Sequence, residues 1–547
     1  MVTEVQVKRL LSLGILLAGL LGGVLRAQDV RLQVLGTTDM HGHIEARDTF
    51  SLAPDAKGWA KVATLIRQRR EANPNTVLLD CGDTIQGEPV NYVRNRLHPD
   101  LPEPSIAIMN ALGYTAMAVG NHDYDFGMEV LRGAEKQAKF PLLSANTFIG
   151  KGTRTAFPAF TKVQVAGVTV LVVGFTTPAV PNWMAPASYG NHRFADIVET
   201  AKGLLPKLRE REKADVVVVA MHSGLGSLPG APMDENAALR LAEQVPGIDL
   251  ILTGHTHVTV KSQHKGIPIL QARAHGRALM AADLTLRRNG SRWQVVAAQA
   301  DVIDVRAELP DDAEALALTG QVRALTETYL NTAATNLQVD LDGRFTRMED
   351  TAYMQLLHAV QRQATGAQLS AAACMNPQVY IPKGPTSVRQ FWAMMPYENG
   401  LVRLRVSGEQ LRRYLEHAAR YYNYPHLPDL YTKGFAGYNF DTLDGVSYAL
   451  DISRPPGERV VGLSFNGQPV RPEQTFTLAL SSYRYFGGGG YRAAVGWTAE
   501  PEAVFDAGLR NEIFAYVLAR PNLAPAPARN WRLVPSLDRE RILSLRR

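Results

Sequence analysis

Residues 250–257 read Leu-Ile-Leu-Thr-Gly-His-Thr-His, so a short apolar run passes within two residues into a pair of histidines. Four other apolar runs lead into polar side chains in the same manner, at residues 38–41 (Thr-Asp-Met-His), 80–83 (Asp-Cys-Gly-Asp), 120–123 (Gly-Asn-His-Asp) and 221–223 (Met-His-Ser). Short apolar runs bounded by turn residues are typical of buried strands. Because amphipathic segments separate these runs, the sequence predicts a layered α/β domain in which strands alternate with helices.

The composition narrows the class of protein. The 547 residues are 46% hydrophobic and 20% charged, which excludes a disordered chain and a multi-pass membrane protein. At about 150 residues per domain, the length predicts two or more domains. The net charge of +6 suits an anionic substrate, and no basic run interleaved with aromatics predicts binding to a nucleic-acid polymer. The only two cysteines, Cys81 and Cys374, lie far apart, which excludes a disulfide framework and a cysteine-based zinc site.

The first 27 residues are predicted to be an export signal. Lys8 and Arg9 precede an apolar run at residues 10–24, and Ala27 offers a small residue for cleavage. The run of about 15 residues is short for a bilayer, which needs about 20. We therefore favour a signal peptide over a membrane anchor or a buried strand. This predicts a periplasmic or secreted protein without a stable membrane anchor.

The chain changes character after residue 309. Residues 310–337 are rich in Ala, Leu, Glu and Thr with helical spacing, which predicts a linking helix. An amphipathic helix is expected at residues 350–363, and short strands at residues 445–480 are followed by a glycine-rich segment at 486–490. The predicted organisation is a signal peptide at 1–27, a first domain at 28–309, a linking helix at 310–337, an α+β domain at 338–530 and a basic tail at 531–547.

The five predicted strand ends carry seven side chains that bind metal ions in proteins. Carboxylates, imidazoles and an amide oxygen suit Mn, Zn, Co or Mg, and the lack of thiolates argues against a structural zinc site. Seven ligands are too many for one tetrahedral ion but suffice for two ions sharing a carboxylate, the geometry that clamps both oxygens of a phosphoryl displacement. We expect Asp83 to be the shared carboxylate. The seven residues are Asp39, His41, Asp83, Asn121, His222, His255 and His257.

With these motifs in place, the segment from Asp39 to His257 resembles the calcineurin-like metallophosphoesterases, and the chain after residue 27 resembles the secreted two-domain 5'-nucleotidase family. The resemblance implies a four-layer α/β sandwich, in which two β-sheets are flanked by helices, followed by an α+β C-terminal domain that binds the nucleoside. It also implies the two metal sets: Asp39, His41, Asp83 and His257 for one ion, and Asp83, Asn121, His222 and His255 for the other.

His122 follows the predicted ligand Asn121, and the resemblance implies that it is catalytic. The matching histidine of the family approaches the phosphate and is oriented by an acid three residues on, which here is Asp125. An imidazolium near the ester oxygen can stabilise developing charge or protonate the leaving alkoxide. His43 either supports the ligands from behind or belongs to a turn, and the sequence leaves both readings open.

The second domain is expected to select the substrate. The family sandwiches the base between two aromatic rings, and the match implies Phe440 and Tyr483, although Phe440 is also compatible with an ordinary core position. Stacking tolerates any base, because every base has a π face. Residues 82–87, 369–373 and 438–441 resemble the 2',3'-cyclic-nucleotide 2'-phosphodiesterase/3'-nucleotidase branch.

Two departures separate the chain from the 5'-nucleotidase branch. The Asn-Gly-Gly-x-Arg loop of that branch is missing around residues 372–377, and Gly489 replaces the acid of its Gly-Gly-Asp-Gly run. Other segments also differ from the cyclic branch, Cys374-Met375 among them, so the base preference stays open.

We therefore expect an exported, monomeric enzyme with two divalent ions and a small nucleotide substrate. A metal-activated water would open 2',3'-cyclic nucleotides at the 2' oxygen and then hydrolyse the 3'-nucleotide in the same site. A 5'-nucleotidase or UDP-sugar hydrolase and a thiosulfohydrolase are rivals on the same scaffold. A noncatalytic nucleotide-binding or surface protein is a rival of another class, and such a protein would be expected to have lost ligands.

Overall fold

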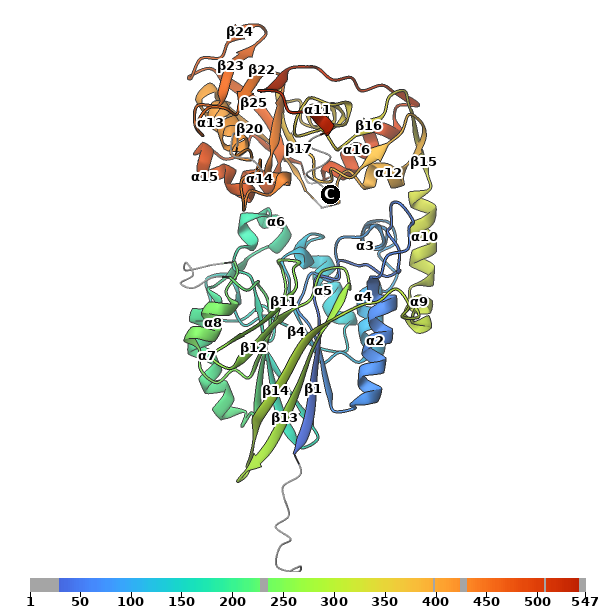
Figure 1. Cartoon of the computed structure of the whole chain (residues 1–547), viewed down its shortest axis with the longest axis vertical. Helices are drawn as coiled ribbons and strands as arrows, with labels where there is room; N and C mark the ends of the chain where they lie inside the picture. The colour runs from blue at the N-terminus through green and yellow to red at the C-terminus, as the bar shows by residue number, and fades with distance from the viewer. Residues whose placement is uncertain (1–28, 227–234, 397–398, 424–429, 506–507, 541–547) are drawn as a thin grey trace, which may run out of the picture.

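The computed structural model describes residues 29–226, 235–396, 399–423, 430–505 and 508–540. They form two domains stacked along the long axis, with the N-terminal domain below and the C-terminal domain above (Figure 1). The predicted export signal at residues 1–27 lies outside the described residues. In the part of the chain that is described, no helix is both long and apolar enough to cross a membrane.

The N-terminal domain contains two six-stranded sheets. The first runs in the order β14 (Arg292–Asp304), β13 (Ala278–Asn289), β1 (Val30–Thr37), β2 (Thr76–Asp80), β3 (Ala116–Ala118) and β4 (Leu142–Leu143). The second runs in the order β11 (Val260–His264), β12 (Ile267–Gln271), β10 (Leu250–Thr253), β9 (Val216–His222), β7 (Val168–Thr176) and β6 (Phe160–Val165). β1, β2, β3 and β4 are parallel to one another, as are β7, β9, β10 and β12.

Helices flank the paired sheets, which completes four layers (Figure 1). The helices and short strands of this domain are α2 (Gly58–Ala72), α3 (Pro89–Tyr92), η1 (Val93–Leu97), α4 (Pro104–Leu112), η2 (His122–Tyr124), α5 (Met128–Gln137), β5 (Thr147–Ile149), η3 (Val180–Asn182), α6 (Pro186–Tyr189), β8 (His192–Phe194), α7 (Ile197–Arg211) and α8 (Ala238–Gln244). The sandwich predicted for the first domain is confirmed.

The continuous apolar runs arise because the central strands are buried on both faces. In β9, Val216 and Val218 join the core between the two sheets, whereas Val217 and Val219 join the core beneath α7 and α8. Alternate side chains of a strand point to opposite faces, so a strand covered on both sides has no polar positions in its middle.

The C-terminal domain is an α+β unit, as predicted. Its five-stranded sheet runs β21 (Asp441–Asp444), β17 (Leu369–Ala373), β25 (Thr475–Ser481), β20 (Leu401–Ser407) and β26 (Ala503–Phe505). A four-stranded sheet runs β24 (Gln468–Pro469), β23 (Val460–Phe465), β22 (Ser447–Asp451) and β28 (Trp531–Val534), and β16 (Leu341–Asp342) pairs with β18 (Tyr380–Ile381). The helices are α11 (Ala352–Thr365), α12 (Val388–Trp392), α13 (Gly408–Ala419), η4 (Gly437–Asn439), α14 (Ser482–Phe486), η5 (Gly488–Gly490), α15 (Tyr491–Val495) and α16 (Leu509–Leu518).

The predicted boundaries of the linker and of the tail were wrong. Residues 310–337 are two helices, α9 (Ala313–Leu318) and α10 (Gly320–Leu330), followed by β15 (Ala333–Leu337). Thr319 is not helical at ψ 3°, and β15 joins a small sheet with β19 (Gly384–Ser387) and β27 (Asn522–Leu523). The predicted tail begins too early, because β28 pairs with β22 and buries Trp531.

Candidate metal centre

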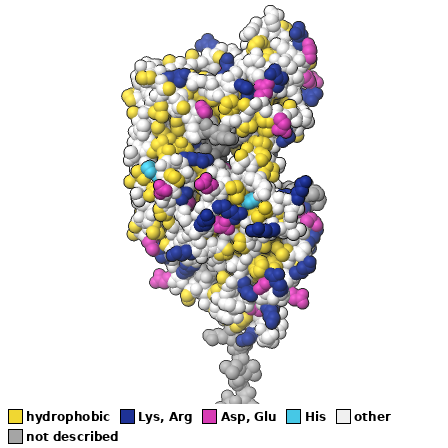
Figure 2. Space-filling view, turned by 180° about the vertical axis from the view of Figure 1, so that it is seen from behind, with side chains coloured by type: hydrophobic (Ala, Val, Ile, Leu, Met, Phe, Trp, Pro, Cys, Tyr) yellow, Lys and Arg dark blue, Asp and Glu magenta, His cyan; other side chains and the backbone are white. Residues whose placement is uncertain are grey.

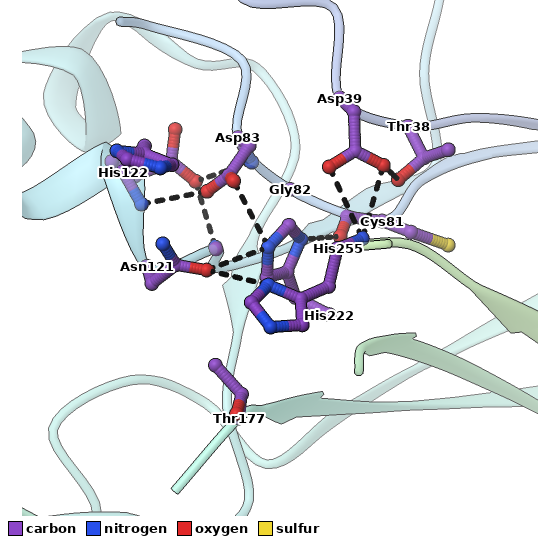
Figure 3. Close-up of polar contacts among 12 residues, drawn as sticks. Thr38, Asp39, Cys81, Gly82, Asp83, Asn121, His122, Thr177, His222 and His255 are labelled. Atoms are coloured by element: carbon purple, nitrogen blue, oxygen red, sulfur yellow. Dashed lines mark hydrogen bonds and ion pairs between the residues drawn. The ribbon is translucent and has the colours of Figure 1, made fainter. Parts of the chain in front are cut away.

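The carboxyl ends of β1, β2, β3, β9 and β10 meet at the edge of the N-terminal domain that faces the C-terminal domain (Figure 1). Parallel strands bring their carboxyl ends to the same edge of a sheet, where α/β proteins place their ligands. The structure gathers all seven predicted metal ligands at this edge, and Figure 3 shows how Asp39, Asp83, Asn121, His222 and His255 lie there. The roles of these side chains as ligands remain proposals.

The first predicted set converges on one point. Its ligand atoms lie within 4.8 Å of one another, and they belong to Asp39, His41, Asp83 and His257. The Nε2 atoms of His41 and His257 are 3.1 Å apart, and His257 Nε2 is 3.4 Å from Asp39 Oδ1. Two neutral imidazoles whose lone pairs face each other repel unless a proton or a cation lies between them, so this arrangement fits a bound cation.

The members of the second set, Asp83, Asn121, His222 and His255, are all labelled in Figure 3 and point toward one another. The Asn121 side-chain oxygen lies 3.0 Å from His222 Nε2 and 3.0 Å from His255 Nδ1. His222 Nε2 is also 3.0 Å from Asp83 Oδ2. An amide oxygen, two imidazoles and a carboxylate oxygen therefore face a common point, which is a donor set for a borderline or hard divalent ion.

Asp83 lies between the two sets. Its Oδ2 atom is 3.0 Å from His222 Nε2 and 3.9 Å from His41 Nε2, one histidine of each set. Although buried, this oxygen accepts no hydrogen bond from the described residues. A buried carboxylate oxygen without a hydrogen bond is costly, so its position fits a ligand shared by two cations.

Two histidines are held in the tautomer that metal binding requires. His41 Nδ1 lies 2.9 Å from the Gln86 carbonyl oxygen, and His222 Nδ1 lies 2.7 Å from the Cys81 carbonyl oxygen. A carbonyl oxygen only accepts, so in each ring Nδ1 carries the proton. The Nε2 lone pair of the neutral ring then points into the site.

The electrostatics of the site also favour a cation. Burial lowers the pKa of His41 to about 3 and that of His255 to about 3, so both rings are neutral. Burial alone would raise the pKa of Asp39, but the hydrogen bond and charge of His257 lower it to about 2. Without a metal ion, burial would lower the pKa of His222 but Asp83 raises it to about 9, so a bound cation would take the place of a proton at His222 Nε2.

The backbone is unusual at the same residues. Asp39, His41, Asp83, His255 and His257 all have positive φ, between 46° and 78°. This left-handed region costs a non-glycine residue on the order of 1 kcal/mol, and such residues cluster at functional sites where the surroundings hold them in place. The conformation turns each side chain back toward the common centre instead of along its strand.

His122 and Asp125 form the predicted pair. His122 Nδ1 lies 2.9 Å from Asp125 Oδ2, and the His122 backbone N–H donates to Asp83 Oδ1 at 2.7 Å. Burial would lower the pKa of His122, but Asp125 and Asp83 raise it to about 10. Both carboxylates therefore favour the protonated ring, and its side chain is 25% exposed, so it can reach a bound ligand.

His43 supports the site from behind. Its Nε2 atom pairs with Glu88 Oε1 at 2.7 Å, and its ring stacks on His275 with centroids 4.1 Å apart. The His275 ring in turn meets the rings of His41 and His257 edge-on, at 5.7 and 5.9 Å. Of the two readings left open by the sequence, the structure favours support of the ligands.

Two residues were missed by the sequence analysis. Asp123 accepts hydrogen bonds from the backbone N–H groups of Asp83, Thr84 and Gly120 at 2.7 to 3.1 Å, so it holds the loop that presents Asp83. It belongs to the quoted motif at residues 120–123, which was a signal available in the sequence. Trp183 lies over His255, with ring centroids 5.2 Å apart, and no local sequence motif predicts this contact.

The structure does not support base stacking by Phe440. Its side chain is 1% exposed, and its ring packs against Tyr421, Tyr422 and Trp531 in the core of the C-terminal domain. A ring enclosed by other aromatic rings has no free face for a base. Phe440 is therefore the core residue that the alternative reading described.

Tyr438, two residues earlier, is 45% exposed at the turn η4. Tyr483 is partly buried in α14, and the guanidinium of the next residue, Arg484, donates to the Tyr438 carbonyl oxygen at 2.6 Å. Tyr438 and Tyr483 thus lie on neighbouring segments of the C-terminal domain, the first exposed and the second partly buried.

The two domains meet around this site. α14, which carries Tyr483, packs against η3 of the N-terminal domain. Seen from behind, the surface is indented between the two domains, and charged side chains gather along its lower margin (Figure 2).

Comparisons with known proteins agree with this architecture. The model of the calcineurin-like phosphoesterases matches residues 32–259, and that of the 5'-nucleotidase C-terminal domain matches residues 330–496. The 2',3'-cyclic-nucleotide 2'-phosphodiesterase/3'-nucleotidase of Salmonella typhimurium is 29% identical over 95% of this chain and 91% of that protein. The trifunctional nucleotide phosphoesterase YfkN of Bacillus subtilis is 27% identical over 93% of this chain, which spans 39% of that protein.

Among solved structures, a Staphylococcus aureus chain provisionally named a 5'-nucleotidase has a TM-score of 0.80 at 22% identity, over 92% of this chain and 100% of that chain. Calcineurin-like phosphoesterases use divalent metal ions, and the Asp39, His41, Asp83 and His257 cluster suits such an ion. The chain belongs to the family of two-domain proteins that join a calcineurin-like phosphoesterase domain to a 5'-nucleotidase C-terminal domain.

Proposed function

We propose that this protein is a phosphohydrolase with two divalent metal ions that opens 2',3'-cyclic nucleotides to 3'-nucleotides and dephosphorylates these to nucleosides. The observation that carries the proposal is the convergence of two donor sets on Asp83 Oδ2, a buried oxygen that accepts no hydrogen bond from the described residues. Relatives named for this activity extend over most of the chain, at 28 to 29% identity.

The chain's own residues would share the chemistry. Two divalent ions, Mn, Zn, Co or Mg, would polarise the phosphoryl oxygens and lower the pKa of the attacking water. Asp39, His41, Asp83 and His257 would hold one ion, and Asp83, Asn121, His222 and His255 the other. His122, whose protonated form is favoured by Asp125, would donate its proton to the leaving alkoxide. Asp125 would keep the His122 ring oriented toward that oxygen.

The same residues would serve both steps. The cyclic ester and the 3'-monoester each present non-bridging oxygens to the metal centre and an alkoxide leaving group to His122. Tyr438 and Tyr483 would hold the base by stacking, in place of the Phe440 and Tyr483 pair expected from the sequence. The active protein would be a monomer acting on small nucleotides, with no nucleic-acid polymer as partner.

Export to the periplasm or the medium is part of the proposal. It rests on the sequence of residues 1–27, in which a basic start precedes a short apolar run.

A side-by-side assay tests the activity. We expect kcat/KM to be higher for 2',3'-cAMP and 3'-AMP than for 5'-AMP and a UDP-sugar, and EDTA to abolish every activity. A higher kcat/KM on 5'-AMP than on both preferred substrates would assign the chain to the 5'-nucleotidase alternative. Absence of hydrolysis with Mn, Zn, Co and Mg alike would favour a noncatalytic nucleotide-binding protein.

A further inference from the structure

Arg484 follows Tyr483 in α14 and is 1% exposed. Its guanidinium pairs with Asp441, with Nη2 2.7 Å and Nε 3.0 Å from Oδ1. Tyr414 also donates to this carboxylate, at 2.5 Å from Oδ2. A buried charge needs a partner with complete hydrogen bonding, and Asp441 supplies it. Because its charge is compensated inside the domain, Arg484 is not placed to attract a substrate phosphate.

The same guanidinium holds the turn that carries Tyr438. Nη2 donates to the Tyr438 carbonyl oxygen at 2.6 Å, and Nη1 donates to the Asn439 side-chain oxygen at 2.9 Å. Arg484 is therefore bonded to residues 438, 439 and 441 while its own backbone continues that of Tyr483. One rigid, planar group connects the segment that carries the exposed Tyr438 with the segment that carries the partly buried Tyr483.

The glycines after α14 are shaped around this connection. A Cβ atom at Gly488 would lie 2.4 Å from the Tyr483 ring, so the ring rests directly on the loop backbone. A Cβ atom at Gly489 would lie 2.6 Å from the Asn439 side-chain oxygen and 3.1 Å from Arg484 Nη1. The space that the acid of the Gly-Gly-Asp-Gly run would need is thus filled by the Arg484–Asn439 pair.

We propose that Arg484 is a positioning residue for base recognition: by joining the Tyr438 turn to the Tyr483 helix, it sets the separation of the two rings between which the base stacks. The inference rests on the proposed function and names the part of the chain that determines its substrate class. It also relates the glycine at position 489 to this connection, because the Asn439 and Arg484 side chains would have to move to admit a larger residue there.

Adenosine inhibition tests the inference independently of the ester that the enzyme cleaves. The substrate is bis(p-nitrophenyl) phosphate, which carries no base, and the competitive inhibition constant of adenosine is measured for the whole protein. Arg484→Lys keeps a charge for Asp441 but cannot form the forked contacts to residues 438 and 439. We expect it to weaken adenosine inhibition by about 5- to 100-fold, the range for losing one stacked base contact, while hydrolysis of the base-free ester stays within about 2-fold.

A double-variant cycle separates positioning from direct contact. If Arg484 acts through Tyr438, Tyr438→Ala combined with Arg484→Lys weakens adenosine inhibition no more than about 2-fold beyond the larger single effect. Additive effects, or an unchanged adenosine constant in a folded Arg484→Lys variant, would overturn the inference. Arg510→Lys is a matched control, since Arg510 is also buried in this domain but packs on Trp392 and donates to Met395. It should leave the adenosine constant unchanged.

The outcomes for the inference and for the proposed function are distinct. Arg484-dependent adenosine inhibition without hydrolysis of 2',3'-cAMP would retain the positioning role and reject the proposed activity. If the enzyme hydrolyses 2',3'-cAMP but Arg484→Lys leaves the inhibition constant of adenosine unchanged, the proposed activity would be retained and the positioning role rejected. Equal losses on the base-free ester and in adenosine binding would mean a general structural role, and would reject the inference.

Discussion

At the scale of single residues, neighbouring groups that are not themselves candidate ligands hold the candidate ligands in place. They fix the tautomers of two histidines and one oxygen of the shared carboxylate. The Gln86 and Cys81 carbonyl oxygens set the tautomers of His41 and His222. Asp83 receives a backbone N–H from His122 on one oxygen and leaves the other free for the centre. Each of these contacts leads to a measurement on one substituted residue.

Asp83→Asn should remove both metal ions, because the variant loses the negative charge between the two donor sets. We expect elemental analysis of the purified variant to show an ion content near zero, against two ions per chain in the wild type. Asp196→Asn is the control, since Asp196 is also buried but pairs with Arg240 away from the centre. An Asp83→Asn protein that retains two ions would contradict the assignment of a shared carboxylate.

His122→Ala should keep its metal ions and lose catalysis. A positioned acid or electrostatic group contributes roughly 10² to 10⁴ to kcat, so we expect a loss of that size. His192→Ala is the matched control, because His192 is a buried histidine hydrogen-bonded to Tyr124 outside the centre. A parallel fall in metal content would instead identify His122 as a ligand.

Glu103 should make stability depend on pH. Burial raises its pKa from 4.5 to about 7. Between these values the folded chain keeps a proton that the unfolded chain has released, so stability falls as pH rises from about 4.5 to 7 and then levels off. In Glu103→Gln this fall, about 3 kcal/mol for one group, should disappear, because Gln can still accept from the Ile106 N–H that Glu103 caps. Urea unfolding of both proteins at pH 5 and pH 7.5 measures how much the free energy of unfolding falls between the two pH values. An equal fall in the wild type and in Glu103→Gln would contradict the prediction.

At the scale of elements, the site is built from strand ends and the loops that follow them. Parallel strands from both sheets end at one edge, and five of the seven candidate ligands there have a left-handed backbone: Asp39, His41, Asp83, His255 and His257. The loop after β2 is held by Asp123, which lies in the loop after β3 and accepts three consecutive N–H groups, from Asp83 to Ile85. The loop after β3 thereby holds the loop after β2 in its conformation.

Asp123→Ala should loosen the Asp83 loop without removing a ligand. Four buried backbone N–H groups, those of Asp83, Thr84, Ile85 and Gly120, would lose their acceptor. This costs on the order of 2 to 4 kcal/mol of stability, and we expect weaker metal binding in the folded variant. Asp123→Asn keeps one acceptor oxygen, so its stability and metal affinity should lie between those of the wild type and of Asp123→Ala. Urea unfolding and metal titration measure both quantities, and unchanged metal affinity in folded Asp123→Ala would refute a role for this loop contact.

At the scale of the whole molecule, the candidate metal centre and the proposed base-stacking residues belong to different domains. Helix α10 contacts residues of both domains. Arg389 of α12 donates to the Thr49 carbonyl oxygen and pairs with Glu327 of α10, each at 2.6 Å. Arg323 of α10 pairs with Glu45 of the N-terminal domain at 2.7 Å. The metal centre lies on one side of this junction, and Tyr438 and Tyr483 lie on the other.

This separation predicts a split in substrate dependence. Tyr438→Ala and Tyr483→Ala should each lower kcat/KM on 2',3'-cAMP by roughly five- to two-hundred-fold, the value of about 1 to 3 kcal/mol for one stacked base. Both should hydrolyse bis(p-nitrophenyl) phosphate nearly as well as the wild type. Phe440→Ala is the informative comparison, since a core cavity should lower stability without this selectivity. Equal losses of kcat/KM on both substrates in the tyrosine variants would contradict the prediction that the C-terminal domain binds the base and the N-terminal domain carries the metal centre.

The sequence by itself determined the first domain and its seven candidate ligands. An apolar run followed by a polar turn is a local pattern, and parallel pairing brings such turns together whatever the exact length of the connecting helices. The amphipathic helix at the start of the second domain was predicted within two residues for the same reason, because a periodic burial pattern is written along the chain.

Only the tertiary structure decided what lies between distant segments. The sequence predicted Phe440 as a stacking residue and left an ordinary core position open, and Tyr421 and Trp531 enclose its ring, whereas Tyr438 is exposed. Residues 333–337 form a strand because both β19 and β27 pair with them, and β27 lies nearly two hundred positions away along the chain. Burial and pairing depend on which segments meet in space, and a local pattern carries no information about a partner that is remote along the chain.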